Sequence, residues 1–223
     1  MRPYLLTRGQ GIRNQPVRTI GRGHPGQQTV HFPSRKNEGV VICESRLEAD
    51  FCLWLEYDLE VVSYRPQPQT IPLFVDAVLH RYTPDFLAVY FTGEEKAWEV
   101  KPHGVYQWPA YLRKIAAAKE YFAAQGQGFE LITDEAIRRQ PHLRSLRWLY
   151  AHAHVIGPHA RRYLWDWLKG AGGSSTLGHL LQQGAPVSIC AIADAIFCGQ
   201  LAIRLDTPLG PSSLLTIQGV RRD

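Results

Sequence analysis

Two carboxylates and one lysine lie close together between residues 82 and 101. Asp85 stands near the start of this stretch, and Glu99 and Lys101 stand at its end, separated by Val100. Because residues two apart on a β-strand point to the same face, Glu99 and Lys101 are expected to project together while Val100 turns into the core. A hairpin would bring Asp85 alongside Glu99. Metal-dependent phosphodiester hydrolysis needs hard oxygen ligands and a group that positions or activates water, and these residue types supply both.

A third acid, Glu48, lies one turn into a helix predicted over residues 44–57. Ser45 and Glu48 have the spacing of a capping box, in which the two side chains satisfy unpaired amides at the helix start. Glu48 can therefore be a structural residue, or it can be aimed at the other carboxylates. Glu44, on the same segment, is the competing candidate for an acidic ligand.

The electrostatics of these acids favour a bound cation. Two carboxylates about 4 Å apart repel each other by roughly 4 kcal/mol at an effective dielectric constant near 20. One lysine cannot neutralise three acids, so either a carboxylate is protonated or a divalent ion binds. In a polar cleft the ion is the better solution.

A surface hairpin that carries a Glu–Lys pair is the alternative interpretation, because the pattern of Asp followed by Glu-x-Lys is short. The predicted strands favour the site, as does Pro84, which tends to hold Thr83 extended just before the acid. The nuclease interpretation requires the carboxylates of residues 85 and 99 to lie on the same side of the sheet.

Periodicity of the apolar residues predicts an α/β domain over residues 40–142. Amphipathic helices are predicted at 44–57 and 109–125. Strands are predicted at 61–64, 70–75, 82–91, 96–101 and 129–133, with a turn at 92–95. The order of helix, antiparallel strands, crossover helix and strand predicts a mixed sheet flanked by helices.

Helices dominate the predicted C-terminal domain, residues 143–223. They are expected at 143–153, 159–169, 176–183 and 188–198, followed by strands at 200–205 and 213–217. This order predicts a winged-helix-like domain. The best candidate for a recognition helix has no Arg or Lys, which favours protein docking over base readout. Four basic residues remain candidates for phosphate contacts: Arg161, Arg162, Lys169 and Arg204.

Residues 1–39 form a predicted basic arm with no helical or strand period. The arm carries seven Arg or Lys residues against one acid, Glu38. It is either a mobile tail or a segment that lies along a phosphate backbone. The formal net charge of +5 for the whole chain also fits a polyanionic partner.

The cysteines and the hydropathy of the sequence indicate the cellular compartment in which the protein is expected. The four cysteines form no CxxC pair and have no zinc-finger spacing, so buried free thiols in a reducing compartment are expected. No apolar run resembles a signal peptide or reaches the roughly 20 residues that span a bilayer. The protein is therefore expected to be cytoplasmic and to have no membrane partner.

Four motifs, in this order, resemble the TnsA family, the endonuclease subunit of heteromeric TnsABC-type transposases, some of them CRISPR-associated. The resemblance runs from about residue 40 to residue 137, and the domain order extends it to the C-terminus. The motifs are Ser45-Arg46-Leu47-Glu48 with Phe51, Thr83-Pro84-Asp85-Phe86-Leu87, Glu99-Val100-Lys101-Pro102, and the segment 129–137.

The resemblance implies a restriction-endonuclease-like fold for the N-terminal half and a metal-dependent DNA endonuclease activity. It implies that Mg²⁺, with Mn²⁺ as a substitute, binds as one or two ions to Glu48, Asp85, Glu99 and Val100. Lys101 is expected to orient the attacking water or to stabilise developing phosphorane charge. The implied catalytic residues are thus Glu48, Asp85, Glu99 and Lys101.

The implied substrate is double-stranded DNA at the ends of a transposon. A TnsA-like protein cuts the 5′ ends, while a TnsB-like DDE transposase cuts and joins the 3′ ends. The C-terminal half is expected to contact a TnsC-like AAA+ regulator and DNA. Two alternatives remain: a free-standing restriction or repair nuclease, and a catalytically inactive DNA-binding adaptor.

Overall fold

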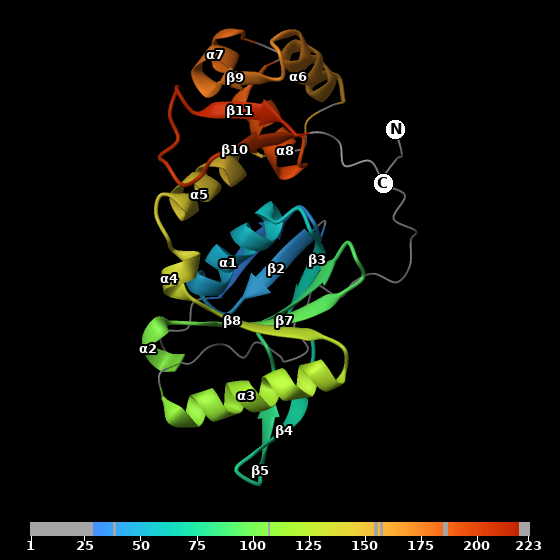
Figure 1. Ribbon diagram of the computed structural model, residues 1–223, viewed down its shortest axis with the longest axis vertical. Coiled ribbons are helices and arrows are strands. Elements are labelled where there is room, and N and C mark those ends of the chain that lie inside the picture. Colours follow the sequence, from blue (N-terminus) through green and yellow to red (C-terminus); the bar gives the residue numbers. More distant parts are fainter. Residues whose placement is uncertain are drawn as a thin grey trace. The chain divides into compact units, whose positions relative to one another are not determined.

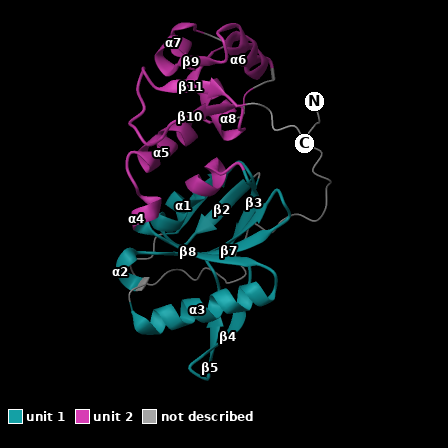
Figure 2. Cartoon of the chain, in the orientation of Figure 1, with its two compact units in different colours: residues 1–52, 60–134 teal, residues 53–59, 135–223 magenta. Residues whose placement is uncertain are grey.

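The structure, a computed structural model, describes residues 29–37, 39–106, 108–153, 156, 158–184 and 187–218. Two compact units make up the chain (Figure 2): Met1–Cys52 with Glu60–Asp134, and Leu53–Leu59 with Glu135–Asp223. No helix in these described ranges is long and apolar enough to cross a membrane.

A four-stranded mixed sheet forms the centre of the first unit (Figure 1). Its order is β3 (Val61–Pro66), β6 (Phe86–Tyr90), β7 (Glu95–Lys101) and β8 (Gly128–Thr133). The first three strands run antiparallel, and β7 pairs in parallel with β8. A parallel pair needs a crossover connection, and α3 (Pro109–Ala124) lies in that connection. The predicted mixed sheet with a crossover helix is therefore confirmed.

Neighbouring residues of β6 face opposite sides of the sheet and pack against different helices. On one side Leu87 packs with Phe122 of α3 and with Phe129 of β8, whose rings are stacked with centroids 5.6 Å apart. On the other side Phe86 contacts Phe51 of α1 (Arg46–Tyr57), at 5.8 Å between ring centroids. The apolar stripes that predict both helices are the surfaces that cover the sheet.

The predicted strand over residues 82–91 is wrong as a single element. Tyr82 ends β5 (Val78–Tyr82), and β6 begins only at Phe86. The break contains Pro84, which has no N–H to donate to a strand ladder. β5 pairs instead with β4 (Ile71–Val75) in a separate two-stranded sheet whose turn has positive φ at residues 76 and 77.

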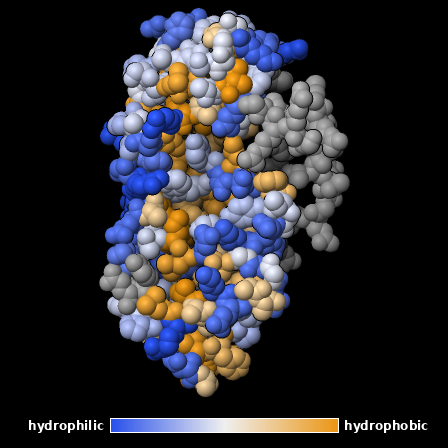
Figure 3. All heavy atoms as spheres, in the orientation of Figure 1, coloured by the Kyte–Doolittle hydropathy of each residue, from blue (hydrophilic) through white to orange (hydrophobic). Residues whose placement is uncertain are grey.

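Apolar side chains reach the surface on this hairpin as well as on the face drawn in Figure 3. Phe74 and Leu79 are cross-strand partners and are 69% and 58% exposed. Ile71, Leu73 and Tyr82 of the hairpin pack into the core that α3 covers, whereas His80, the partner of Leu73, is exposed.

A hairpin of β1 (Val30–Ser34) and β2 (Gly39–Cys43) precedes α1. The prediction of an arm without strands over residues 1–39 is therefore wrong for residues 30–34; residues 1–28 lie outside the described residues. Phe32 and Ser34 are buried while Pro33 is exposed, so β1 has the period of two that the scattered Gly and Pro residues obscured.

The second unit consists mainly of helices: α5 (His142–His152), α6 (Pro158–Gly170), α7 (Leu177–Gln182) and α8 (Ile189–Phe197). β10 (Leu201–Ile203) and β11 (Leu214–Ile217) pair as predicted, and β9 (Ser174–Thr176) adds an edge that the sequence did not predict. Thr176 and Ser188 cap α7 and α8, each accepting a bond from a backbone amide.

The longer segment of the second unit starts at Glu135, whereas the predicted domain boundary is at residue 143. The short helix α4 (Asp134–Ile137) explains the difference. Ile137 is fully buried, and its carbonyl accepts a bond of 2.9 Å from Nε1 of Trp54, which belongs to the same unit. Four residues are too few for a hydrophobic period to indicate this helix.

Replacement of Phe122 by alanine is expected to lower the free energy of unfolding by about 3–5 kcal/mol, because it leaves a cavity beneath α3. Leu112→Ala on the same helix is the control, since Leu112 is 48% exposed. Urea denaturation of both variants measures the difference. Equal losses in the two variants would contradict the assignment of the core.

Candidate active site

The structure brings Asp85, Glu99 and Lys101 together at one end of the central sheet. Nζ of Lys101 lies 3.0 Å from Oδ2 of Asp85 and 3.1 Å from Oε1 of Glu99. Glu99 and Lys101 alternate along β7, and Asp85 immediately precedes β6, where Phe86 pairs with Trp98. The hairpin register therefore places Asp85 opposite Glu99, on the side where Lys101 also lies.

Burial and repulsion raise the pKa of Asp85. Loss of water is the largest cause, the charge of Glu99 adds to it, and the Lys101 ammonium opposes both, which leaves a pKa of about 7. Burial alone would lower the pKa of Lys101, but the two carboxylates outweigh this effect and raise it. Lys101 is therefore charged at neutral pH, whereas Asp85 exchanges a proton there. Positive charge added near Asp85 stabilises the charged form of its carboxylate.

Two tyrosines hold the Glu99 carboxylate. The hydroxyl of Tyr82 donates to Oε2 and that of Tyr111 donates to Oε1, both at 2.7 Å. Glu99 is only 3% exposed, so these bonds replace the water that its charge would otherwise bind. Burial, followed by the charge of Glu99, raises the pKa of both phenols. Both hydroxyls therefore stay protonated and act as donors.

Sequence reasoning missed these tyrosines as members of the site. Tyr82 precedes Asp85 by three residues and so lies within the motif, but its hydroxyl could have served any partner. Tyr111 is expected from the sequence only as one of the apolar residues of α3. No local signal links it to Glu99, because the contact exists only once α3 packs against the sheet.

Glu48 carries out the structural function that its spacing indicates. Its Oε1 accepts from Oγ of Ser45 at 2.9 Å, its Oε2 accepts from the amide of Glu44 at 2.8 Å, and its own amide donates to Ser45 at 3.1 Å. These bonds form a capping box. In the usual pattern the Glu side chain accepts from the amide of the capping Ser, whereas here it accepts from the amide of Glu44.

The charge of Glu48 also reaches the other acids. Burial raises the pKa of Glu48, and its bonds to Glu44 and Ser45 and the charge of Lys101 partly offset this. Glu48 in turn adds to the causes that raise the pKa of Asp85.

The oxygen donors of Asp85 and Glu99 suit a hard divalent cation. Oδ2 of Asp85 accepts from the Val100 amide at 2.7 Å and from Lys101, but no described residue donates to Oδ1. Val100 can offer only its main-chain carbonyl, because its side chain is apolar. Within the described ranges, no three or more His, Cys, Asp or Glu side chains group closely enough to hold a metal. The arrangement therefore fits an ion whose main protein ligands are the carboxylates of Asp85 and Glu99.

The stability of the metal-free protein is expected to fall as pH rises from about 4 to about 7. Over this range the folded state retains a proton on Asp85, whose pKa is raised from 3.8 to about 7, while the unfolded chain has lost it. The slope from one such group reaches at most about 1.4 kcal/mol per pH unit. Urea denaturation of wild type and Asp85→Asn at several pH values, with a chelator present, measures this pH dependence of stability.

Asp85→Asn removes the titrating group, so its stability is expected to change less over this pH range. Asp76→Asn is the matched control, because the Asp76 side chain is 62% exposed in the hairpin turn. Parallel curves for wild type and Asp85→Asn would show that the Asp85 pKa is not raised.

Tyr111→Phe is expected to lower the free energy of unfolding by about 1.5–3 kcal/mol, the usual range for a hydrogen bond to a charged group. Tyr121→Phe on the same helix is the control, since the Tyr121 ring packs against Phe122 and no described residue bonds its hydroxyl. Thermal and urea denaturation of both variants measure the effect. If Tyr111→Phe matches Tyr121→Phe, the bond to Glu99 does not stabilise the fold.

Comparison with known proteins shows a similarity over the segment that holds most of this site. Residues 58–134 match the family model described as TnsA-like endonuclease N terminal. No curated protein matches the chain. The matched segment contains Asp85, Glu99 and Lys101, and Glu48 precedes it. The resemblance in the sequence motifs is thereby confirmed over residues 58–134, which are similar to a TnsA-like endonuclease N-terminal domain.

Proposed function

We propose that the chain is a Mg²⁺-dependent DNA endonuclease that cuts the 5′ ends of a transposon. The observation that carries the proposal is the contact of one ammonium with the buried carboxylate of Glu99 and the largely buried carboxylate of Asp85, inside the segment that matches the TnsA-like endonuclease model. A surface hairpin with a Glu–Lys pair would leave these groups in water, whereas Glu99 is 3% exposed. Burial of several charges is costly and is typical of sites that do chemistry.

Asp85 and Glu99 would hold the metal, with the carbonyl of Val100 as a further proposed ligand. Glu48, the other proposed ligand, would join them only by giving up its capping bonds to Glu44 and Ser45. A bound Mg²⁺ polarises a phosphoryl oxygen and lowers the pKa of a bound water. Lys101 is charged at neutral pH and fixed by both carboxylates, so it can stabilise negative charge that develops on the phosphoryl oxygens. Tyr82 and Tyr111 orient Glu99 and exclude water from it.

The fold of the first unit, a mixed sheet between α1 and α3, supports the proposal of a restriction-endonuclease-like domain. In the second unit the order α6, β9, α7, α8, β10, β11 supports the proposal of a winged-helix-like domain.

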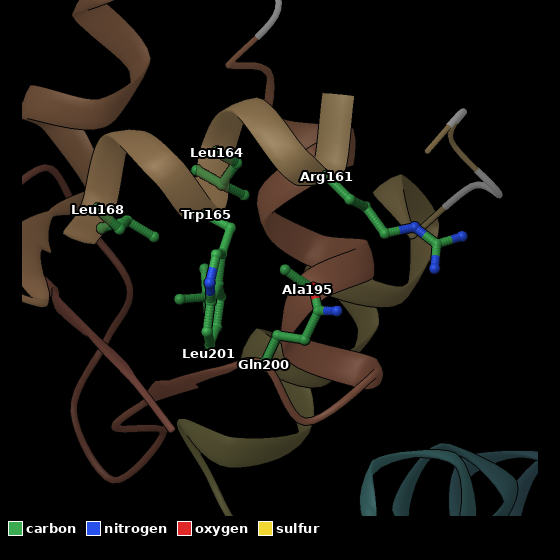
Figure 4. A pocket seen from close by; sticks show the side chains of 7 residues that line it. All are labelled: Arg161, Leu164, Trp165, Leu168, Ala195, Gln200 and Leu201. Carbon is green, nitrogen blue, oxygen red and sulfur yellow. The ribbon is translucent and has the colours of Figure 1, made fainter. Parts of the chain in front are cut away.

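The second unit is proposed to dock a TnsC-like AAA+ regulator and to bind DNA weakly. Residues 191–197 of α8 are all buried, so this helix belongs to the core of its unit and presents no base-reading face. Nε of Arg161 lies 3.0 Å from Oδ2 of the fully buried Asp194, and Arg204 pairs with Asp206. Two of the four basic candidates are thus already bound to acids. α6 and α8 also border a shallow, mostly apolar pocket (Figure 4).

Transposition with Asp85→Ala tests the proposed activity. In the presence of TnsB-like and TnsC-like partners, wild type is expected to give simple insertions. Asp85→Ala is expected to give cointegrates, because 3′ joining continues without the 5′ cut. A chelator is expected to abolish the 5′ cut, with Mg²⁺ or Mn²⁺ restoring it. Asp76→Ala, at the exposed hairpin turn, is the control and should behave as wild type.

Simple insertions at wild-type level with Asp85→Ala would overturn the proposal. Cleavage by the isolated protein would instead indicate a free-standing restriction or repair nuclease. DNA binding that is unchanged in Asp85→Ala and Lys101→Ala, without cleavage by wild type, would indicate an inactive adaptor.

A further inference from the structure

Gln67 has a backbone conformation that its neighbours in the sequence disfavour. It follows β3 with φ of +42°, in the left-handed region that costs a non-glycine residue energy. Pro68 comes next, and a residue before proline is normally extended. Asp76 and Ala77, the other non-glycine residues with positive φ in the described part of the chain, form the tight turn of the β4–β5 hairpin, where this conformation is ordinary.

The strained backbone of Gln67 is bonded to the main chain of Asp85. The amide of Gln67 donates to the carbonyl of Asp85 at 2.9 Å. Three residues later, Oγ1 of Thr70 lies 2.7 Å from Oγ1 of Thr83, two residues before Asp85. The segment 67–70 therefore holds the segment 83–85 at both ends. This matters because residues 83–85 form the break between β5 and β6 and lack a strand ladder of their own.

The side chain of Gln67 lacks a partner that its burial demands. Gln67 is 4% exposed, and its buried Oε1 accepts no hydrogen bond from any residue of the described ranges. A buried carbonyl oxygen without a donor costs free energy, so a donor other than the described residues is expected. A phosphate oxygen cannot donate, whereas water can donate and is small enough for such a position.

We propose that Gln67 is a positioning residue of the nuclease site, a proposal that rests on the proposed function. Its strained main chain fixes Asp85 in place, and its carboxamide oxygen accepts a hydrogen bond from a water molecule held in the site. Strained backbone persists where the surrounding structure imposes it and where function benefits from it. Gln67 would thus keep the carboxylate of Asp85 and one water in a fixed position relative to each other.

Gln67→Gly tests both parts, because glycine adopts positive φ freely and has no carboxamide. The melting temperature is expected to stay at the wild-type value or to rise, since the backbone strain disappears. The rate of 5′ cleavage in the transposition reaction is expected to fall roughly 10- to 100-fold, the range for a catalytic group that is slightly misplaced. Gln67→Asn keeps the amide and tolerates positive φ, and is expected to retain part of the cleavage rate.

Two variants serve as controls. Gln69→Gly changes an exposed glutamine two residues away, and Ala77→Gly relaxes positive φ at the hairpin turn. Both are expected to cleave as wild type does. Wild-type cleavage by Gln67→Gly would overturn the positioning role, and a clear fall in its melting temperature would overturn the strain. If wild type itself makes no 5′ cut, the proposed function fails instead, while the melting temperatures still test the strain.

Discussion

The contact of the Lys101 ammonium with the carboxylates of Asp85 and Glu99 is the interaction on which the site depends. Either carboxylate, buried without this cation, would have to take up a proton. The cluster has one cation for two acids, and the charge of Glu48 also acts on Asp85. It therefore retains an excess of negative charge. Burial is the largest cause of the raised pKa of Asp85, and this excess of negative charge raises it further. A site that lacks positive charge in this way is suited to a divalent ion.

Polar groups from distant parts of the chain make the burial of these charges tolerable. Tyr82 and Tyr111 come from a separate hairpin and from α3, and both donate to Glu99. Glu48 serves its own helix as a cap while its field acts on Asp85. Loss of activity on substitution of Glu48 therefore has two possible origins, since the same change removes a helix cap and a charge.

Spacing along the chain was sufficient to predict the local part of the site. Glu99 and Lys101 are two apart on a strand, so their common direction follows from strand geometry. The position of Asp85 followed from the hairpin, although its strand was predicted too long because periodicity does not show where Pro84 interrupts it. Tyr111 and Gln67 could not be predicted, because their contacts depend on how α3 and the end of β3 pack. The strand β1 was hidden by proline and glycine residues that are unusual in strands.

The connection between β6 and β7 has a consequence for the order of assembly. The bonded groups of Asp85 and Val100 are only 15 residues apart in the chain, and the two strands join through a tight turn. Closing so short a loop costs little conformational entropy, whereas the parallel pairing of β7 with β8 must wait until α3 has crossed the sheet. The two carboxylates and the ammonium can thus meet while still hydrated. Water would leave them late in folding, when Tyr111 arrives with its helix to take over the hydrogen bonds.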